Sequence, residues 1–92
     1  MNNSRANKEV MSAYSMHRET GEMRYTLIRS TVDKRDAFSI SVMQITPSGD
    51  INYKEADDVC CEKDCATALF RAIAEGEVEP CLLYDILYDI LP

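Results

Sequence analysis

The C-terminal stretch of residues 79–91 constrains the fold of this 92-residue chain more than any other. It is the most apolar part of the sequence, and Leu-Tyr-Asp-Ile occurs twice in it, four residues apart. Pro80 suits the first position of a helix, where its missing N–H is not needed. On a helical wheel the apolar side chains fill an arc of about 180°, which is wider than the roughly 100° that a surface helix buries. The stretch therefore predicts a helix that either lies wedged between a sheet and another helix or contacts another molecule.

Three segments before this helix have the composition of β-strands. Residues 23–32 and the shorter segment 51–55 contain β-branched or aromatic side chains. Residues 37–46 alternate between apolar and small polar side chains, which is typical of a strand with one buried and one solvated face. Proline and glycine at 46–49 indicate a turn. The sequence therefore predicts a three-stranded antiparallel β-meander. The alternation places Phe38, Ile40 and Val42 on one face, and Ser39 and Ser41 on the other.

An amphipathic helix is predicted between the third strand and the last helix. Asp57 or Asp58 is expected to cap its first turn, and Gly76 to follow its last residue. One face of the helical wheel is shared by Cys65, Ala66, Leu69, Phe70, Ala72 and Ile73. We therefore expect both C-terminal helices to pack on one face of the sheet.

The N-terminal residues 1–21 are polar and mixed in charge, with few apolar anchors. Ala6, Val10, Met11 and Tyr14 are at roughly helical spacing. We expect this segment to be a disordered tail or a short helix. The predicted protein is then a single α+β domain over residues 22–92, with a three-stranded antiparallel β-meander and two C-terminal α-helices packed on one face.

Charge is distributed unevenly along the chain. The net charge is −6, and residues 57–92 contain nine acidic side chains against only Lys63 and Arg71. Such acidity disfavours direct binding to nucleic-acid phosphates but permits binding to a basic protein surface. Because the N-terminus has no apolar signal region and no run is long enough to cross a membrane, we expect a cytoplasmic protein with reduced cysteines.

Catalytic and metal-binding patterns are weak in this sequence. Cys60, Cys61 and Cys65 are close together, but Cys81 is the only later cysteine, so the second pair of ligands of a structural zinc site is missing. His17, the single histidine, lies in the N-terminal segment and is the only candidate base for a nucleophile. Three scattered glycines cannot form a phosphate-binding loop. The sequence therefore predicts no enzyme activity, no cofactor, no metal and no small-molecule substrate.

The best candidate for a functional surface is the last helix. Tyr84 and Tyr88 form an aromatic pair at i, i+4, and tyrosine is enriched at the energetic centres of interfaces. The alternative is that both rings lie at the edge of the core with their hydroxyls in water. The predicted interface residues are Tyr84, Asp85, Leu87, Tyr88, Asp89 and Leu91. We expect a small interaction or regulatory module that binds a protein partner, or itself as a homodimer, through this helix. The second hypothesis is an acidic inhibitor of a nucleic-acid-binding enzyme, which mimics nucleic acid in a basic groove.

The order of elements over residues 25–91 also resembles a family of small uncharacterised bacterial domains. The similarity is most specific where Val78-Glu79-Pro80-Cys81-Leu82-Leu83-Tyr84-Asp85 begins the last helix, because members share a Pro-x-x-Leu-Tyr-Asp start after a similar link. The resemblance implies a strand meander with two C-terminal helices and a bacterial origin. It implies no catalytic residues.

Overall fold

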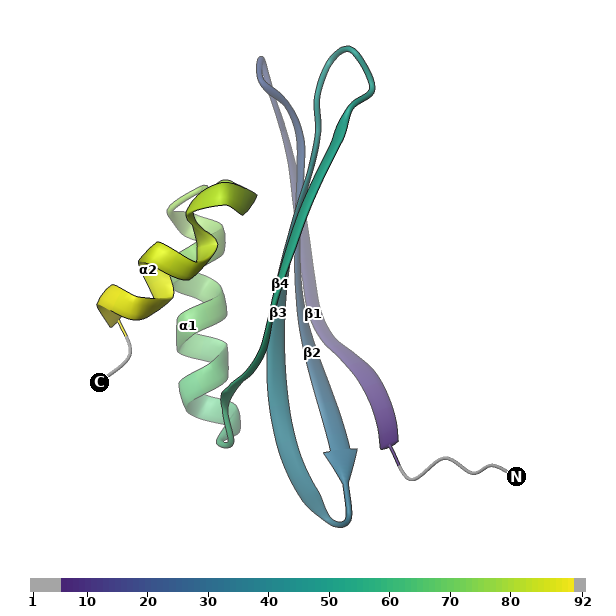
Figure 1. Ribbon diagram of the computed structural model, residues 1–92, viewed down its shortest axis with the longest axis vertical. Coiled ribbons are helices and arrows are strands. Elements are labelled where there is room, and N and C mark those ends of the chain that lie inside the picture. Colours follow the sequence, from purple (N-terminus) through teal and green to yellow (C-terminus); the bar gives the residue numbers. More distant parts are fainter. Residues whose placement is uncertain (1–5, 91–92) are drawn as a thin grey trace.

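The computed structural model describes residues 6–90, which form a sheet covered on one face by helices (Figure 1). The sheet is a four-stranded antiparallel meander in the order β1-β2-β3-β4. Two C-terminal helices follow it in the chain and lie on the same side of the sheet. The elements are β1 (Ala6–Arg18), β2 (Gly21–Val32), β3 (Arg35–Ile45), β4 (Ile51–Cys60), α1 (Lys63–Glu75), a short 3-10 turn (Pro80–Leu82) and α2 (Leu83–Ile90). The predicted α+β class and the two helices packed on one face are confirmed.

The apolar face predicted for β3 is confirmed, but the prediction that the serine face is solvated was wrong, because Ser39 and Ser41 are also buried. Phe38, Ile40 and Val42 are fully buried beneath the helices. Ser39 and Ser41, which must point to the opposite face of a pleated strand, are small side chains that are shielded in the middle of the sheet. One face of the sheet thus supplies the core, and no described helix covers the other face.

The N-terminal prediction was wrong for Ala6–Arg18, which is neither a tail nor a helix but the edge strand β1. It pairs antiparallel with β2 from Ala6↔Val32 to Arg18↔Gly21, with a bulge between Val10 and Ser12. The meander therefore has one strand more than the sequence predicted. Pairing with a strongly strand-forming neighbour overrides the weak local preference of these residues, because strand formation depends on cross-strand packing.

The start of α1 also differs from the prediction. Asp57 and Asp58 do not cap the helix, because β4 continues through both of them to Cys60 and Glu62 occupies the N-cap position. Asp58 adopts a positive φ of 55° at an irregularity in the β3–β4 pairing. The buried face of α1 consists of Ala66, Leu69, Phe70, Ile73 and Ala74. The prediction that Cys65 and Ala72 lie on that face was wrong, because both residues are exposed.

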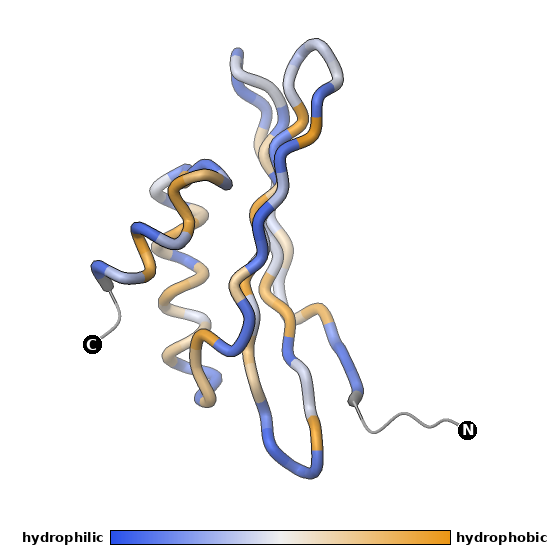
Figure 2. The backbone as a smooth tube through the Cα atoms, viewed as in Figure 1, coloured by the Kyte–Doolittle hydropathy of each residue, from blue (hydrophilic) through white to orange (hydrophobic). Residues whose placement is uncertain are grey.

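Tight turns set the register of the meander. Asp33 and Lys34 connect β2 to β3 with φ values of 52° and 67°, as in a two-residue type I′ hairpin. The turn is strongly hydrophilic (Figure 2). The predicted turn between β3 and β4 is confirmed: the Gly49 N–H donates to the Thr46 carbonyl at 2.9 Å, and Gly49 has a φ of 96°. Short connections of this kind leave each strand beside its neighbour in the chain.

Candidate functional site

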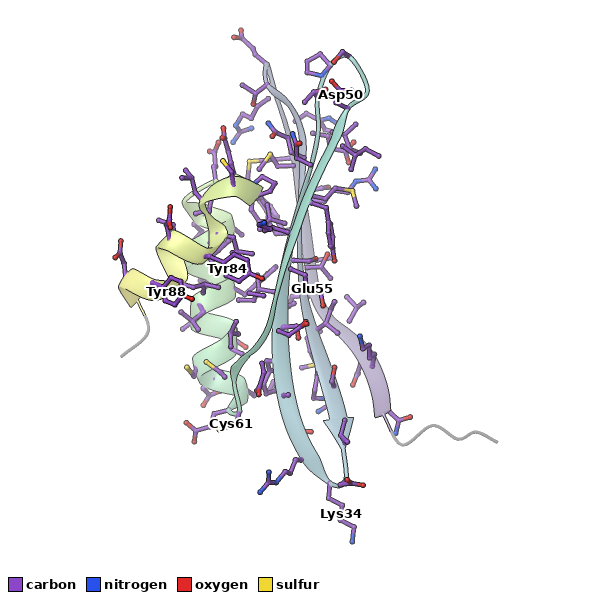
Figure 3. All side chains as sticks on the ribbon, viewed as in Figure 1. Lys34, Asp50, Glu55, Cys61, Tyr84 and Tyr88 are labelled. Carbon is purple, nitrogen blue, oxygen red and sulfur yellow. The ribbon has the colours of Figure 1, made fainter. Side chains whose placement is uncertain are left out.

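The exposed surface of α2 contains most of the residues that the sequence proposed as an interface. The prediction was wrong for Leu87, which points into the core with 4% of its surface exposed, next to Leu83 with 0%. Tyr88 is 80% exposed (Figure 3). Asp85 and Asp89, which precede it by three residues and follow it directly on the same helix, are also exposed. Leu91 lies outside the described residues. We use the term α2 patch for Tyr84, Asp85, Tyr88 and Asp89, which the helix brings together on one side.

Tyr84 differs from Tyr88 in having contacts with the sheet. Its hydroxyl donates a hydrogen bond of 2.7 Å to the backbone carbonyl of Glu55 on β4. The ammonium nitrogen of Lys54 lies 5.7 Å from the centroid of the same ring, within the range of a cation–π contact. Tyr84 therefore holds α2 against the outer edge of β4, whereas Tyr88 extends into solvent (Figure 3).

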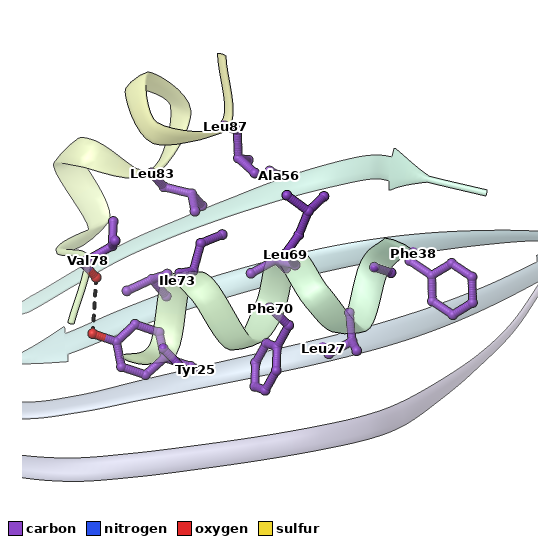
Figure 4. Close-up of a cluster of buried hydrophobic side chains, with 14 of the residues drawn as sticks. Tyr25, Leu27, Phe38, Ala56, Leu69, Phe70, Ile73, Val78, Leu83 and Leu87 are labelled. Atoms are coloured by element: carbon purple, nitrogen blue, oxygen red, sulfur yellow. Dashed lines mark hydrogen bonds between the residues drawn. The ribbon is translucent and has the colours of Figure 1, made fainter. Parts of the chain in front are cut away.

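The apolar arc of the last helix is therefore divided into a buried part and an exposed part. Part of it is buried, since Leu83 and Leu87 pack into the same cluster as Ile73 and Leu69 of α1 (Figure 4). The remainder is exposed: Tyr88 on α2, and Leu82 in the preceding turn with 46% of its surface accessible. Packing within the described chain does not account for the exposed part.

A groove lies between β1 and α1. The sequence did not predict this groove because it did not predict β1. This β1–α1 groove encloses about 490 Å³ and has an apolar floor that includes Tyr14, Met16 and Phe70. Its lining residues are Ser12, Tyr14, Met16, Arg18, Thr67, Phe70, Arg71, Ala74, Glu75 and Glu77. The available signal was the period-2 spacing of Ser12, Tyr14, Met16 and Arg18, which places them on one face of a strand.

An ion pair joins β1 to the segment after α1 beside this groove. The Arg18 guanidinium donates two hydrogen bonds to the Glu77 carboxylate, at 3.1 and 3.0 Å. These bonds lower the pKa of Glu77 and raise that of Arg18. Both side chains are about half exposed, so the pair is worth little in stability. It does orient the end of β1 relative to the link that leads into α2.

Tyr25 makes the buried polar contact between the sheet and that link. Its hydroxyl donates a hydrogen bond of 3.1 Å to the carbonyl of Val78 (Figure 4). Burial raises the pKa of Tyr25 from 10.0 to about 12, with a smaller contribution from the nearby charge of Glu77. The neutral phenol is therefore the form that the fold stabilises.

This contact leads to a prediction about alkaline stability. Because the pKa of Tyr25 is higher in the folded than in the unfolded chain, its contribution is complete below pH 10 and is lost as the pH rises toward 12. Tyr25→Phe should lower the free energy of unfolding by about 1–3 kcal/mol, since the Val78 carbonyl loses its partner. The variant should also lose less stability than the wild type between these pH values. Urea unfolding at several pH values measures both effects.

Tyr88→Phe is the matched control for this measurement. It removes a hydroxyl from an exposed ring, so it should change the free energy of unfolding by less than about 0.5 kcal/mol. Equal effects of the two substitutions would contradict the role given to the Tyr25 hydrogen bond.

The cysteines do not gather into a recognisable site. Cys61, Cys65 and Cys81 are exposed and Cys60 is partly buried, all as free thiols. Burial, together with the adjacent Cys65 thiol, raises the pKa of Cys60 to about 12, which makes Cys60 a poor nucleophile at neutral pH. Among residues 6–90, no group of three or more His, Cys, Asp or Glu side chains is arranged to hold a metal ion.

Comparisons of the chain with protein-family models, with curated proteins and with solved structures found no match. The resemblance to a family of small bacterial domains therefore stays a prediction. No helix in the described part of the chain has the length and apolar character needed to cross a membrane.

Proposed function

We propose that this protein is a non-catalytic interaction module that presents the α2 patch to a partner protein. The observation that supports the proposal best is Tyr88, a large aromatic side chain that is 80% exposed on a helix docked to the core through Leu83 and Leu87. Tyrosine at such a position combines apolar contact area with a hydroxyl that can form a hydrogen bond. Residues with these properties provide much of the binding energy at protein interfaces.

Charge complementarity specifies the chemistry of the partner. Asp85 and Asp89 lie beside Tyr88 and are exposed, and the third of the chain that contains them is strongly acidic. A matching surface offers an apolar pocket for the ring of Tyr88 and arginine or lysine side chains around it. Opposite charges of this kind accelerate association and exclude acidic surfaces, including a second α2 patch. The partner in this proposal is therefore a different protein.

The experiment places a photo-reactive aromatic residue at position 88 in the full chain and irradiates it in cells that naturally produce the protein. The same residue at position 53 is the control, since Tyr53 is a half-exposed tyrosine on β4. A partner that is crosslinked from position 88 and not from position 53 supports the proposal. Equal crosslinking from both positions contradicts it.

Affinity measurements with the captured partner then test the role of Tyr88. Tyr88→Ala should weaken binding by roughly 30-fold, the effect of a loss of about 2 kcal/mol at an interface centre. The free energy of unfolding should change by less than about 0.5 kcal/mol, because the side chain is exposed. Tyr53→Ala should leave the affinity unchanged.

Salt dependence distinguishes the second hypothesis, an acidic mimic of nucleic acid. Binding that is centred on Tyr88 should weaken only modestly as salt increases, because apolar contact is not screened. A nucleic-acid mimic should instead bind with a steep salt dependence, and short duplex DNA should displace it from the partner.

A further inference from the structure

The two edges of the sheet differ in how they are protected. Along β4 the backbone carbonyl of Glu55 is occupied by the hydroxyl of Tyr84, and α2 lies beside the strand. The outer edge of β1 has no paired strand within residues 6–90. An edge strand presents a row of backbone N–H and C=O groups that can pair with another strand. β1 is therefore the edge at which strand addition can occur.

Side chains next to this edge favour an apolar contact. Tyr14 is 50% exposed although its ring stacks on Tyr25, with 6.5 Å between the ring centroids. It faces the β1–α1 groove together with Met16 and Phe70. A strand added to β1 would extend the sheet beneath this groove and cover the exposed half of Tyr14.

We propose that the added strand is β1 of a second copy, paired antiparallel around a two-fold axis through Ser15. The bulge between Val10 and Ser12 interrupts the strand, so its regular part is Ser12–Arg18. Antiparallel pairing of identical strands is symmetric, as a two-fold interface requires. The axis must pass through the middle of the regular part, Ser15, if all of that part is to pair.

In this register, compatible side chains lie opposite one another on both faces of the sheet. On the helix side, Tyr14 faces Met16 of the second copy, and Met16 faces Tyr14 of the second copy. Further from the axis, Ser12 lies opposite Arg18 and Ala13 opposite His17. Apart from the symmetric Ser15 pair, no residue meets its own kind, and no like charges are opposed. The apolar Tyr14–Met16 pairs cover adjoining ends of the two β1–α1 grooves.

Charge distribution also favours self-association at β1 rather than at α2. The described N-terminal residues 6–24 have no net charge, with three basic and three acidic side chains: Lys8, Arg18, Arg24, Glu9, Glu19 and Glu22. The C-terminal third contains the excess acidity of a chain whose net charge is −6. Two such chains repel one another least when they meet through β1. The second copy would therefore bind at the edge of β1, and the partner protein would bind at the α2 patch.

The experiment measures the oligomeric state of the full chain by sedimentation equilibrium over a range of concentrations. The wild type should form dimers of the 10.4 kDa chain. Ser15→Lys should weaken dimerisation by at least about fivefold, because like charges face each other across an antiparallel pair. Ser15 is exposed, so the substitution should leave the fold intact, which circular dichroism checks. Asn52→Lys makes the same change of charge at an exposed position on β4 and should leave dimerisation unchanged.

A mixed sample tests the symmetry axis itself. S15E chains alone should also dimerise weakly, whereas an equal mixture of S15K and S15E chains should dimerise at least as well as the wild type. Restoration in the mixture is expected only if position 15 faces its own counterpart. A wild type that stays monomeric at all concentrations would overturn the proposal. So would S15K chains that dimerise normally, or a mixture that fails to recover.

Discussion

Replacement of Leu83 by alanine is expected to lower the free energy of unfolding by about 2–5 kcal/mol. The Leu83 side chain is completely buried at the start of α2, in the same core cluster as Ile73 and Val78. Truncation removes its apolar contacts and leaves a cavity that the surrounding strands and helices can fill only in part. For a small domain this is a large share of the total stability. Chemical denaturation with urea, followed by circular dichroism, measures the loss.

Leu82→Ala provides a control that differs by a single position. Leu82 has the same side chain but is 46% exposed, so its truncation should cost less than about 1 kcal/mol. If the two variants were equally stable, α2 would not be docked through Leu83. The comparison thus tests the orientation of the helix independently of any partner.

Gly21→Ala is expected to destabilise the protein by about 2–5 kcal/mol, the combined cost of backbone strain and overpacking. Gly21 begins β2 with a φ of 118°, a conformation that side chains with a Cβ rarely adopt. A Cβ built there lies 2.1 Å from the backbone oxygen of Ile45. Relief of this clash requires β2 and β3 to separate at the end of their ladder. Thermal and urea unfolding of the variant measure the cost.

Gly49→Ala is the control that separates backbone strain from overpacking. Gly49 also has a positive φ, of 96°, but nothing lies within 4 Å of a Cβ added there. Its substitution should cost only the conformational strain, about 1–2 kcal/mol. A Gly21 variant no less stable than the Gly49 variant would contradict the close approach of β3 to Gly21.

Side-chain periodicity was sufficient to predict the central part of this fold. Phe38, Ile40 and Val42 are buried in the core as expected, although the serines between them are buried as well and not solvated. Leu83 is at helical spacing with Leu87, and it packs into the core as the helix pattern predicts. In both segments the local pattern and the tertiary environment agree, which is the condition under which sequence analysis succeeds.

β1 was missed because its local pattern points elsewhere. Val10, Met11 and Tyr14 suggest a helix, and the bulge near Met11 shortens the regular period-2 spacing to the residues after it. The β1–α1 groove could not be predicted without this strand. Spacing placed Tyr84 and Tyr88 on one side of the helix, but it did not decide that Tyr88 would be the exposed one. The hydrogen bond from Tyr84 to Glu55 joins residues that are 29 positions apart, and no local pattern indicates such a pairing.

The contact between Tyr84 and the Glu55 carbonyl has a consequence for aggregation. Detachment of α2 would expose the edge of β4 and the apolar cluster around Leu87 in the same event. Free strand edges beside apolar surface are templates for intermolecular β-pairing. Because a short terminal helix opens by local unfolding more readily than the whole domain unfolds, aggregation at β4 should increase with the fraction of chains in which α2 is open. The last helix therefore limits aggregation by keeping one edge of the sheet from joining with other chains.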